Sequence, residues 1–438
     1  MLDLALFRTL EGIAQVKEIQ RKRFGSEEIV DDIAKLIERQ RKIKHELQET
    51  QKRKNEIAAA FKTAKIQKQD LDEHLLIEKE SVDTKIKALG TQYDQLDQQI
   101  KTLVKSIGNF VHPDVVVEQD EAFNKVIRTW GPDRPAPKNP KQHHELFTLI
   151  GGVDMVRGSK LMGHRGYLLI NMGVRLNQAI RNYGMDFLMN RGYKLIETPP
   201  FMYKDLMAKT AQLSQFDEEL YHIEGTDKYL IATSEQPLSC MHSGQIFGEK
   251  DLPIFYGGYS ICFRREAGAA GRDNAGIFRC HNFEKIEQFV LTTAENSDSL
   301  HKQMLKVAEE FYQSLEIPYR VVDIVSGALN NAAIRKFDLE GFFPAFEGIC
   351  KYRELVSCSN CTDYQSRELD IKYTVPLETK GGKAEKKFVH LLNSTLTANT
   401  RTLCAILENY QTETGVEIPT ALLPYMGGLK FIPFVVPK

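Results

Sequence analysis

The stretch from residue 27 to residue 107 most constrains what this chain can fold into, because it contains no proline and a single glycine, Gly90. Apolar residues recur three and four positions apart in two runs, one from Ile29 to Phe61 and one from Ile86 to Ile107. This spacing is typical of a coiled-coil seam, and it lapses at about residues 63–73. We therefore expect an antiparallel hairpin of two helices of roughly 33 residues, each about 50 Å long at 1.5 Å per residue.

The first of these expected helices is basic. Residues 35–68 contain eleven Lys or Arg and four Asp or Glu. Dimerisation is the more common use of heptads, and a single lysine on such a helix more often faces solvent than a ligand. The excess charge nevertheless favours a nucleic-acid partner, since a positive rod attracts phosphates. The expected basic face consists of Lys35, Arg39, Arg41, Lys42, Lys44, Lys52, Arg53 and Lys54.

The pattern changes after the hairpin. Residues 109–142 are rich in proline and charge, with one short strand-like run at 124–130. Beyond His143, helical patterns alternate with strand-like runs at 193–198, 228–232, 259–266, 277–290, 319–325 and 387–393. Since neither G-x-G-x-x-G nor G-x-x-x-x-G-K-[ST] occurs, a doubly wound or P-loop nucleotide domain is disfavoured. We predict an α+β protein with three parts: a helical arm domain (1–108), a linker (109–142), and a mostly antiparallel sheet flanked by helices (143–438).

Bulk composition limits the class of protein. The 58 Lys and Arg nearly cancel the 59 Asp and Glu, so net charge points to no partner. Seven cysteines without a regular framework favour a reducing compartment. There is no run of 18 apolar residues, and the first seven residues resemble neither a signal nor a transit peptide. We expect a cytoplasmic protein without a membrane partner.

The chemistry concentrates between Phe263 and Phe289. Arg264 and Glu266 stand two apart on a strand-like run, a glycine-rich loop follows at 268–276, and alternation resumes. One face of the second strand would carry Arg279, His281, Phe283, Lys285 and Glu287. Cations, an aromatic ring and a carboxylate on one face suit a ligand that is anionic, planar and amine-bearing.

Further segments add polar groups. Glu354 and Ser357 offer oxygen ligands suited to Mg²⁺ or Mn²⁺ held mainly by substrate phosphates. Cys358 and Cys361 have the spacing of half a zinc site, but no second pair completes it, so structural zinc is disfavoured. Arg401 enters an expected helix, where an arginine can hold a terminal phosphate.

Together these motifs resemble the seryl-tRNA synthetases, a family of class II aminoacyl-tRNA synthetases, over essentially the whole chain. Residues 263–287 resemble class II motif 2, residues 393–411 motif 3, and residues 191–199 motif 1, whose proline lies at the family's dimer interface. Residues 233–235, 354–357 and 359–361 are similar to seryl-type signatures, and the hairpin resembles the family's tRNA-binding arm. Motif 3 resembles that of eukaryotic cytosolic members, whereas Asn274 and Ala275 stand where members usually place an arginine.

The resemblance implies an activity and its site. ATP and L-serine would form a seryl-adenylate, and the serine would pass to tRNA(Ser) and to tRNA(Sec), with Mg²⁺ or Mn²⁺ present, in a homodimer. The implied catalytic residues are Arg264 and Arg401. The implied ATP-binding residues are Arg264, Glu266, Arg279, Cys280, Phe283, Glu354, Leu355, Val356, Ser357 and Arg401, with Glu354 and Ser357 as metal ligands. The implied serine-binding residues are Thr233, Ser234, Glu235, Glu287, Asn393 and Thr395.

Two other functions are compatible with the same motifs. A serine-activating paralogue would transfer serine to an acceptor other than tRNA, and a coiled-coil adaptor would keep an inactive synthetase domain. The basic arm argues against the first. The second requires the loss of site residues, and every residue that the resemblance implies for ATP, metal and serine is intact.

Overall fold

The computed structural model describes residues 1–67, 73–132, 138–210, 219–266, 276–346, 351–375 and 384–435. The chain divides into two compact units, Met1–Gly108 and Asn109–Lys438. The separate linker at 109–142 stays a prediction.

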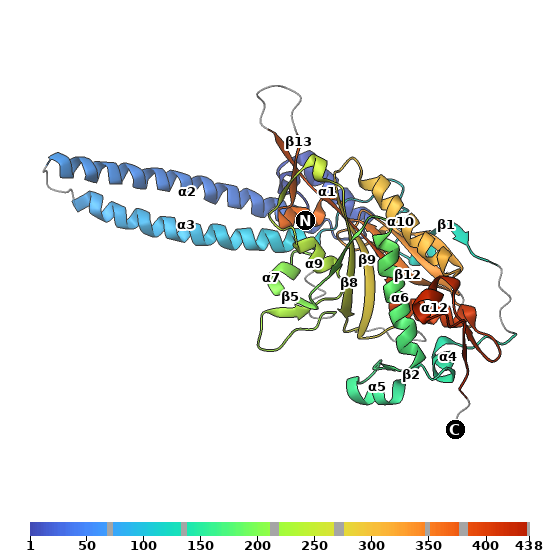
Figure 1. Cartoon of the computed structure of the whole chain (residues 1–438). Coiled ribbons are helices and arrows are strands. Elements are labelled where there is room, and N and C mark those ends of the chain that lie inside the picture. Colours follow the sequence, from blue (N-terminus) through green and yellow to red (C-terminus); the bar gives the residue numbers. More distant parts are fainter. Residues whose placement is uncertain are drawn as a thin grey trace. The chain divides into compact units, whose positions relative to one another are not determined.

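The first unit is helical. A short 3₁₀ helix, η1, precedes α1, and the two long helices α2 and α3 lie side by side as an antiparallel hairpin (Figure 1). Thr9 is the N-cap of α1, and its hydroxyl accepts a hydrogen bond from the Gly12 amide at 3.1 Å. The bounds are η1 Leu4–Arg8, α1 Leu10–Lys22, α2 Glu28–Gln67 and α3 Glu73–Ser106.

The seam of the hairpin follows the predicted spacing. Ile43 of α2 is buried against Leu89 and Leu96 of α3. Cross-hairpin ion pairs join Glu46 to Lys85 at 2.7 Å and Arg53 to Glu78 at 2.7 Å. Later residues of α2 thus pair with earlier residues of α3, as antiparallel helices require. The predicted length of α2 was too short, since the helix has 40 residues and continues to Gln67. Thr63-Ala64-Lys65 can extend the helix even though these residues do not continue the apolar spacing of the coiled coil.

The second unit is built on an eight-stranded sheet of order β1-β10-β11-β12-β15-β9-β8-β4. Every neighbouring pair is antiparallel except β4 with β8. The prediction of a mostly antiparallel sheet is confirmed. The main-sheet strands are β1 Lys125–Trp130, β4 Lys194–Glu197, β8 Ile254–Phe263, β9 Asn282–Thr292, β10 Tyr319–Asp323, β11 Arg335–Phe342, β12 Tyr352–Asn360 and β15 His390–Ala398.

Helices cover one face of this sheet. The main core joins α6, α10 and α12 to alternate residues of the strands, among them Ile286 and Val290 of β9 (Figure 1). The residues between them, such as Glu287 and Phe289, point to the other face, where a second core surrounds Phe289. The larger helices are α4 His143–Leu149, α5 Met155–Met162, α6 Met172–Met189, α9 Glu235–Cys240, α10 Ser297–Ser314, α11 Tyr364–Leu369 and α12 Asn399–Tyr410.

Smaller elements surround the main sheet. Strand β7 pairs with β13, which also pairs with β14, and three two-stranded ladders lie elsewhere. Their bounds are β2 Val153–Asp154, β3 Leu168–Leu169, β5 Phe201–Tyr203, α7 Lys204–Met207, β6 Lys228–Leu230, β7 Ile246–Gly248, β13 Lys372–Val375, β14 Glu385–Phe388, β16 Gly415–Glu417 and β17 Phe431–Pro433.

Three strand predictions were wrong in their bounds. The run predicted at 387–393 is divided between β14 and β15, which belong to different sheets. Strand β9 begins at Asn282, so residues 277–281 approach it as a turn rather than as a strand. Strand β8 ends at Phe263, so Arg264 and Glu266 follow the strand instead of lying on it. Alternation in sequence therefore extended beyond the residues that form ladder hydrogen bonds.

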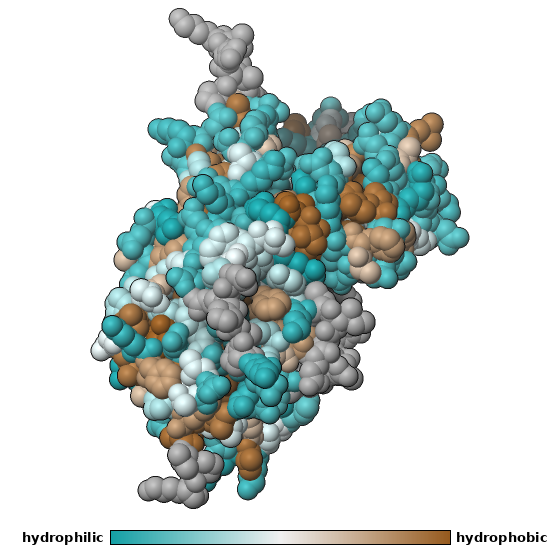
Figure 2. Space-filling model, turned by 90° about the vertical axis from the view of Figure 1, so that its right-hand side faces the viewer, coloured by the Kyte–Doolittle hydropathy of each residue, from teal (hydrophilic) through white to brown (hydrophobic). Residues whose placement is uncertain are grey.

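One face of the molecule is mostly polar (Figure 2). Figure 2 shows a largely hydrophilic face on which hydrophobic side chains form separate small patches. Within the described ranges, no helix combines the length and the apolar composition needed to span a bilayer.

Candidate active site

A pocket of about 240 Å³ opens on the face of the main sheet opposite the helical layer. It is lined by residues of β9, β12 and β15, by the chain after β8, and by the start of α12. The predicted site residues that line it are Thr233, Glu235, Arg264, Glu266, Arg279, Cys280, Phe283, Glu287, Glu354, Leu355, Ser357, Asn393, Thr395 and Arg401. The structure therefore brings together segments that are up to 168 positions apart in sequence, between Thr233 and Arg401.

Two predicted residues do not line the pocket. Ser234 is completely buried behind it, where its hydroxyl donates to Oε2 of Glu287 at 3.0 Å. Val356 points to the opposite face and belongs to the main core. Val356 faces away from the pocket because side chains alternate along a strand and its neighbour Ser357 faces the pocket.

Two β-bulges decide which side chains face the pocket. Glu354 and Ser357 are three positions apart and would face opposite sides of a regular strand. The register between β11 and β12 shifts so that Leu355 is the extra residue, which returns both polar side chains to one face. A second shift leaves Leu396 of β15 unpaired, and both Thr395 and Ala398 reach the same pocket.

A buried ion pair forms one wall of the pocket. Nζ of Lys285 contacts Oε1 of Glu287 at 2.9 Å and Oγ1 of Thr233 at 2.8 Å. The Thr233 hydroxyl in turn donates to Oε2 of Glu287 at 2.6 Å. Burial opposes the charge on Glu287, but Lys285 and the two hydroxyls of Thr233 and Ser234 hold its pKa below the usual range. Glu287 is thus an anion whose acceptor sites are largely occupied.

Gly258 of β8 makes this arrangement possible. It pairs with Glu287 in the ladder. A Cβ at this position would lie 2.6 Å from Cδ1 of Leu238 and 2.8 Å from Oγ of Ser234. The absence of a side chain lets the segment before α9 approach the sheet closely enough for Ser234 to reach the carboxylate.

Glu235 has different surroundings from Glu287. Its Oε1 accepts a hydrogen bond from Nε2 of Gln365 at 2.8 Å. Within the described part of the chain it forms no ion pair. Burial, followed by the negative charge of Glu287, raises the pKa of Glu235 to about 7.

Arg264 and Glu266 reach the pocket from beyond the end of β8. The guanidinium of Arg264 lies 5.4 Å from the centroid of the Phe283 ring. Glu266 has a positive φ of 48°, a conformation that is uncommon outside glycine and that turns the chain here. Its carboxylate lies 3.5 Å from Arg279. The predicted proximity of Arg264 and Glu266 is therefore achieved by a turn and not by strand alternation.

His281 was expected on the same polar face but does not line the pocket. Its Nδ1 lies 2.9 Å from the Tyr221 hydroxyl and 3.1 Å from the Arg264 carbonyl oxygen. It is held there because it precedes β9, where the alternation of the strand does not yet apply.

The donor set at β12 fits a hard divalent cation that also binds substrate oxygens. Glu354 and Ser357 supply a carboxylate and a hydroxyl on one face. Arg401 lies 3.2 Å from Oε2 of Glu354, which leaves the other carboxylate oxygen for a metal. Among the described residues, no group of three or more His, Cys, Asp or Glu side chains could hold a metal alone. Cys358 and Cys361 are buried free thiols, and Cys350, the other cysteine near them in the sequence, lies outside the described residues.

Six lining residues were not among the predicted site residues: Phe278, Lys285, Asn330, Ser359, Ala398 and Thr400. Strand alternation placed Lys285 on the polar face, and Ser359 is two positions after Ser357, so both had a usable signal. Asn330 comes from a loop with no motif, and only the tertiary structure brings it to the site. Residues 268–275 of the predicted glycine-rich loop at 268–276, including Asn274 and Ala275, lie outside the described residues.

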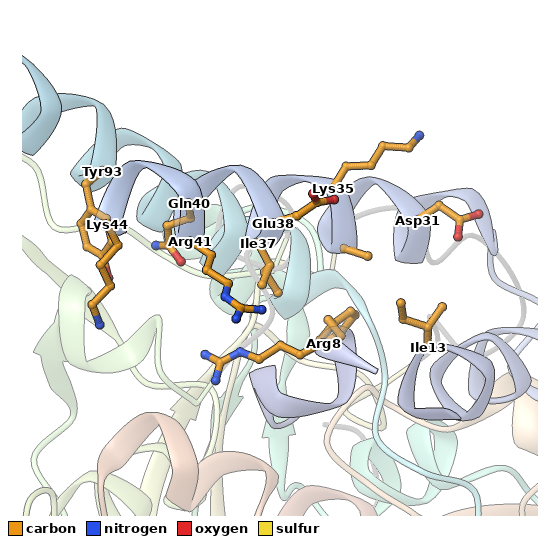
Figure 3. Close-up of a pocket in the computed structure, with 12 residues that line it drawn as sticks. Arg8, Ile13, Asp31, Lys35, Ile37, Glu38, Gln40, Arg41, Lys44 and Tyr93 are labelled. Atoms are coloured by element: carbon orange, nitrogen blue, oxygen red, sulfur yellow. The ribbon is translucent and has the colours of Figure 1, made fainter. Parts of the chain in front are cut away.

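A larger cavity of about 900 Å³ lies within the helical unit. Arg41 and Lys44 of α2 extend toward the space that Arg8 enters from η1, whereas Lys35 points away from it (Figure 3). Tyr93 and Ile37 add apolar surface. Within the described ranges, Arg8, Arg41 and Lys44 form no ion pair, whereas the carboxylates of the same cavity, Asp31 and Glu38, pair with Lys17 and Lys42.

Both units match known families. Residues 1–111 match the family described as "Seryl-tRNA synthetase N-terminal domain", and residues 218–410 match "tRNA synthetase class II core domain (G, H, P, S and T)". The chain is 50% identical over 442 residues to the cytoplasmic serine--tRNA ligase of Schizosaccharomyces pombe, with 99% of this chain and 97% of that protein covered. This chain belongs to the seryl-tRNA synthetase family.

Solved structures of seryl-tRNA synthetases have the same fold. The cytoplasmic enzyme from Naegleria fowleri in complex with AMP matches with a TM-score of 0.85 and 46% identity, covering 100% of this chain and 99% of that one. The enzyme from Pyrococcus horikoshii complexed with ATP matches with a TM-score of 0.88 and 36% identity, covering 100% of both chains. The predictions of the family and of the fold class are thus confirmed, and the chain is a class II aminoacyl-tRNA synthetase.

Proposed function

We propose that this chain attaches L-serine to tRNA(Ser), and to tRNA(Sec), through a seryl-adenylate formed from ATP. The observation that carries the proposal is the single pocket that gathers cations, an aromatic ring and buried carboxylates in a seryl-tRNA synthetase fold. The bound AMP and ATP in the two solved relatives support ATP as the nucleotide. The names of the relatives support a cytoplasmic location.

ATP would lie across β9 and the chain after β8. Phe283 offers its ring to adenine, and Arg264, which lies above that ring, is positioned to reach the α-phosphate. Glu266 and the backbone near Cys280 border the adenine side, while Arg279 and Arg401 hold the outer phosphates. Arg279 lies 3.5 Å from Glu266, and Arg401 lies 3.2 Å from Glu354. Each arginine would contact its glutamate and a phosphate at the same time.

Serine would occupy the pocket end that contains Thr233, Glu235, Glu287, Asn393 and Thr395. The serine ammonium fits Glu235, a carboxylate that forms no ion pair among the described residues. A site that pairs its polar groups with the serine hydroxyl would reject alanine, because buried partners would lose their hydrogen bonds.

The chemistry would proceed in two steps. The serine carboxylate attacks the α-phosphorus of ATP in line, and pyrophosphate leaves. The 3′-hydroxyl of the terminal tRNA adenosine then attacks the carbonyl of the adenylate, and AMP leaves. Arg264 and Arg401 would neutralise charge on the phosphates, so that positioning and electrostatics supply most of the rate. Glu354 and Ser357 would hold Mg²⁺ or Mn²⁺, which supplies further positive charge to the phosphates when bound.

The helical unit would bind tRNA. In the cavity beside α2, Arg8, Arg41 and Lys44 form no ion pair among the described residues, which leaves them available to a phosphate backbone. Of the expected basic face, Arg53 and Lys54 instead pair with Glu78 and Asp83 across the hairpin. A homodimer is proposed from the motif 1 segment at residues 191–199.

The alternative is a paralogue that activates serine for a non-tRNA acceptor. It shares the pocket but has no need of a basic helical unit. Charging of total tRNA with each of the twenty amino acids separates the two functions. Serine alone should be attached to tRNA, and serine-dependent pyrophosphate exchange without any charging would favour the paralogue.

The nucleotide site is tested with Arg264→Ala. This change removes the cation above Phe283, and we expect serine-dependent pyrophosphate exchange to fall by a factor of about 10³ or more, the scale of losing a preorganised charge contact. Arg265→Ala is the matched control, since Arg265 is the next residue and does not line the pocket. Equal exchange rates in the two variants would contradict the assignment of Arg264 to ATP.

A further inference from the structure

Gln365 is a buried polar residue outside the pocket that contacts a pocket residue directly. It lies in α11, is 3% exposed, and is separated by 130 positions from Glu235. Its Nε2 donates to Oε1 of Glu235 at 2.8 Å. One carboxylate oxygen of Glu235 is therefore held by α11, and the other is left for the pocket.

The other end of the same amide has no partner. Oε1 of Gln365 is buried and forms no hydrogen bond within the described part of the chain. A buried amide oxygen normally has a donor. Rotation of the amide would present this oxygen to Glu235 instead, where it could accept from a protonated carboxyl. With Nε2 toward Glu235, the amide favours the ionised carboxylate, which is the stronger acceptor.

The charges around Glu235 make this contact important. Glu287 and Lys285 face it from β9, and Arg264 faces it from beyond β8. Lys285 is engaged with Glu287 at 2.9 Å, so among the described residues Glu287 forms an ion pair and Glu235 does not. Glu235 keeps its proton more readily than an ordinary glutamate, and a donor from α11 opposes that tendency.

From this geometry we infer that Gln365 is a positioning residue for substrate binding: it orients Glu235 and keeps it ionised, so that the free oxygen receives the ammonium of the amino acid. The inference rests on the proposed function, because it takes the amino acid to bind at Glu235. It concerns the affinity for the amino acid and not for ATP, since Gln365 does not line the pocket.

The test uses two variants with opposite expected pH trends. Gln365→Met keeps the side-chain length and removes the donor, so we expect the KM for serine to rise roughly fivefold at pH 7.0, because a rise of about one unit in a pKa near 7 lowers the ionised fraction of Glu235 from about one half to about one eleventh. The defect should shrink at pH 8.5, where Glu235 ionises without help. In Gln365→Glu two adjacent carboxyls share one proton. Its KM for serine should stay near the wild-type value at pH 7.0 and rise at pH 8.5, when that proton is lost.

The control is Gln411→Met. Gln411 is another buried glutamine, whose Nε2 donates to the carbonyl oxygens of Lys141 and Glu408 at 3.0 and 2.9 Å, away from the pocket. Its KM for serine should be unchanged, and the KM for ATP should be unchanged in all three variants.

The readout is serine-dependent pyrophosphate exchange by the full-length protein. An unaltered KM for serine in Gln365→Met, or parallel pH trends in the two Gln365 variants, would overturn the inference. If the wild-type protein itself shows no serine-dependent exchange, it is the proposed function that fails, so the two failures are distinguishable.

Discussion

At the scale of single residues, the site depends on how charge is balanced inside the second unit. Lys285 and Glu287 are 6% and 2% exposed, and both are satisfied by short contacts with each other and with Thr233. Removing one member of a buried pair leaves an uncompensated charge, which costs far more than the pair itself contributes. The same pair shapes the pocket wall.

Lys285→Met provides the test. We expect the free energy of unfolding to fall by about 3–5 kcal/mol, because Glu287 loses its counter-charge, and serine-dependent exchange to be lost. Urea unfolding followed by tryptophan fluorescence reports on this unit, since the single tryptophan, Trp130, lies in β1.

The double variant Lys285→Met, Glu287→Gln separates charge from packing. It buries no charge and should recover part of the lost stability without recovering activity. A double variant as unstable as Lys285→Met would show that lost packing of the lysine, and not the unpaired carboxylate, caused the effect.

The sequence predicted which side chains face the pocket only where the strands follow regular alternation. The period of two placed Phe283, Lys285 and Glu287 on one face, and β9 obeys it. The same rule would have separated Glu354 from Ser357, because a bulge adds one residue and reverses the alternation. Gln365 had no signal in the sequence, since its partner is 130 positions away.

At the scale of elements, α10 is fixed on the main sheet by a buried histidine. Nε2 of His301 lies 3.0 Å from the carbonyl oxygen of Cys358 in β12, and the ring stacks on Phe337 at 5.1 Å. Burial lowers the pKa of His301 to about 4. The helix therefore docks with a neutral imidazole.

This contact predicts loss of stability in acid. The folded pKa of about 4 is below the unfolded value of 6.5, so the stabilisation is complete above pH 6.5 and is lost as the pH falls toward 4. The full loss is at most about 3 kcal/mol, from 1.36 kcal/mol per pKa unit. His301→Gln keeps a donor but does not titrate.

The measurement is the free energy of unfolding in urea at several pH values between 6.5 and 4.5, for the wild type and His301→Gln. Other titrating groups are common to both proteins, so the difference isolates His301. The wild type should lose more stability than the variant over this interval. Identical pH dependence would show that His301 already carries its proton in the folded protein.

At the scale of the whole molecule, the two candidate binding sites belong to two different compact units. The pocket residues belong to the second unit, and the cationic cavity belongs to the first. Amino acid activation and tRNA binding should therefore be affected by different substitutions.

The double variant Arg41→Glu, Lys44→Glu tests this separation. The two charge reversals should raise the KM for tRNA by about tenfold or more at low salt, because each lost phosphate contact weakens binding and reduces its salt dependence. Serine-dependent pyrophosphate exchange without tRNA should be unchanged. Lys302→Glu, Lys306→Glu on the exposed surface of α10 makes the same change in net charge and is the matched control. If both double variants raised the KM for tRNA equally, the effect would come from the net charge of the protein and not from the cavity.

The sequence by itself determined the helical hairpin, the antiparallel character of the second unit and most of the residues of its site. These follow from the spacing of apolar residues and from short motifs, which act over a few positions. The tertiary structure decided what depends on distant neighbours. It set where β8 and β9 end, which strands carry bulges, and which of the predicted cations are neutralised across the hairpin. It also decided that Glu287 is balanced by Lys285 while Glu235 relies on Gln365, because the cost of a buried charge depends on what surrounds it.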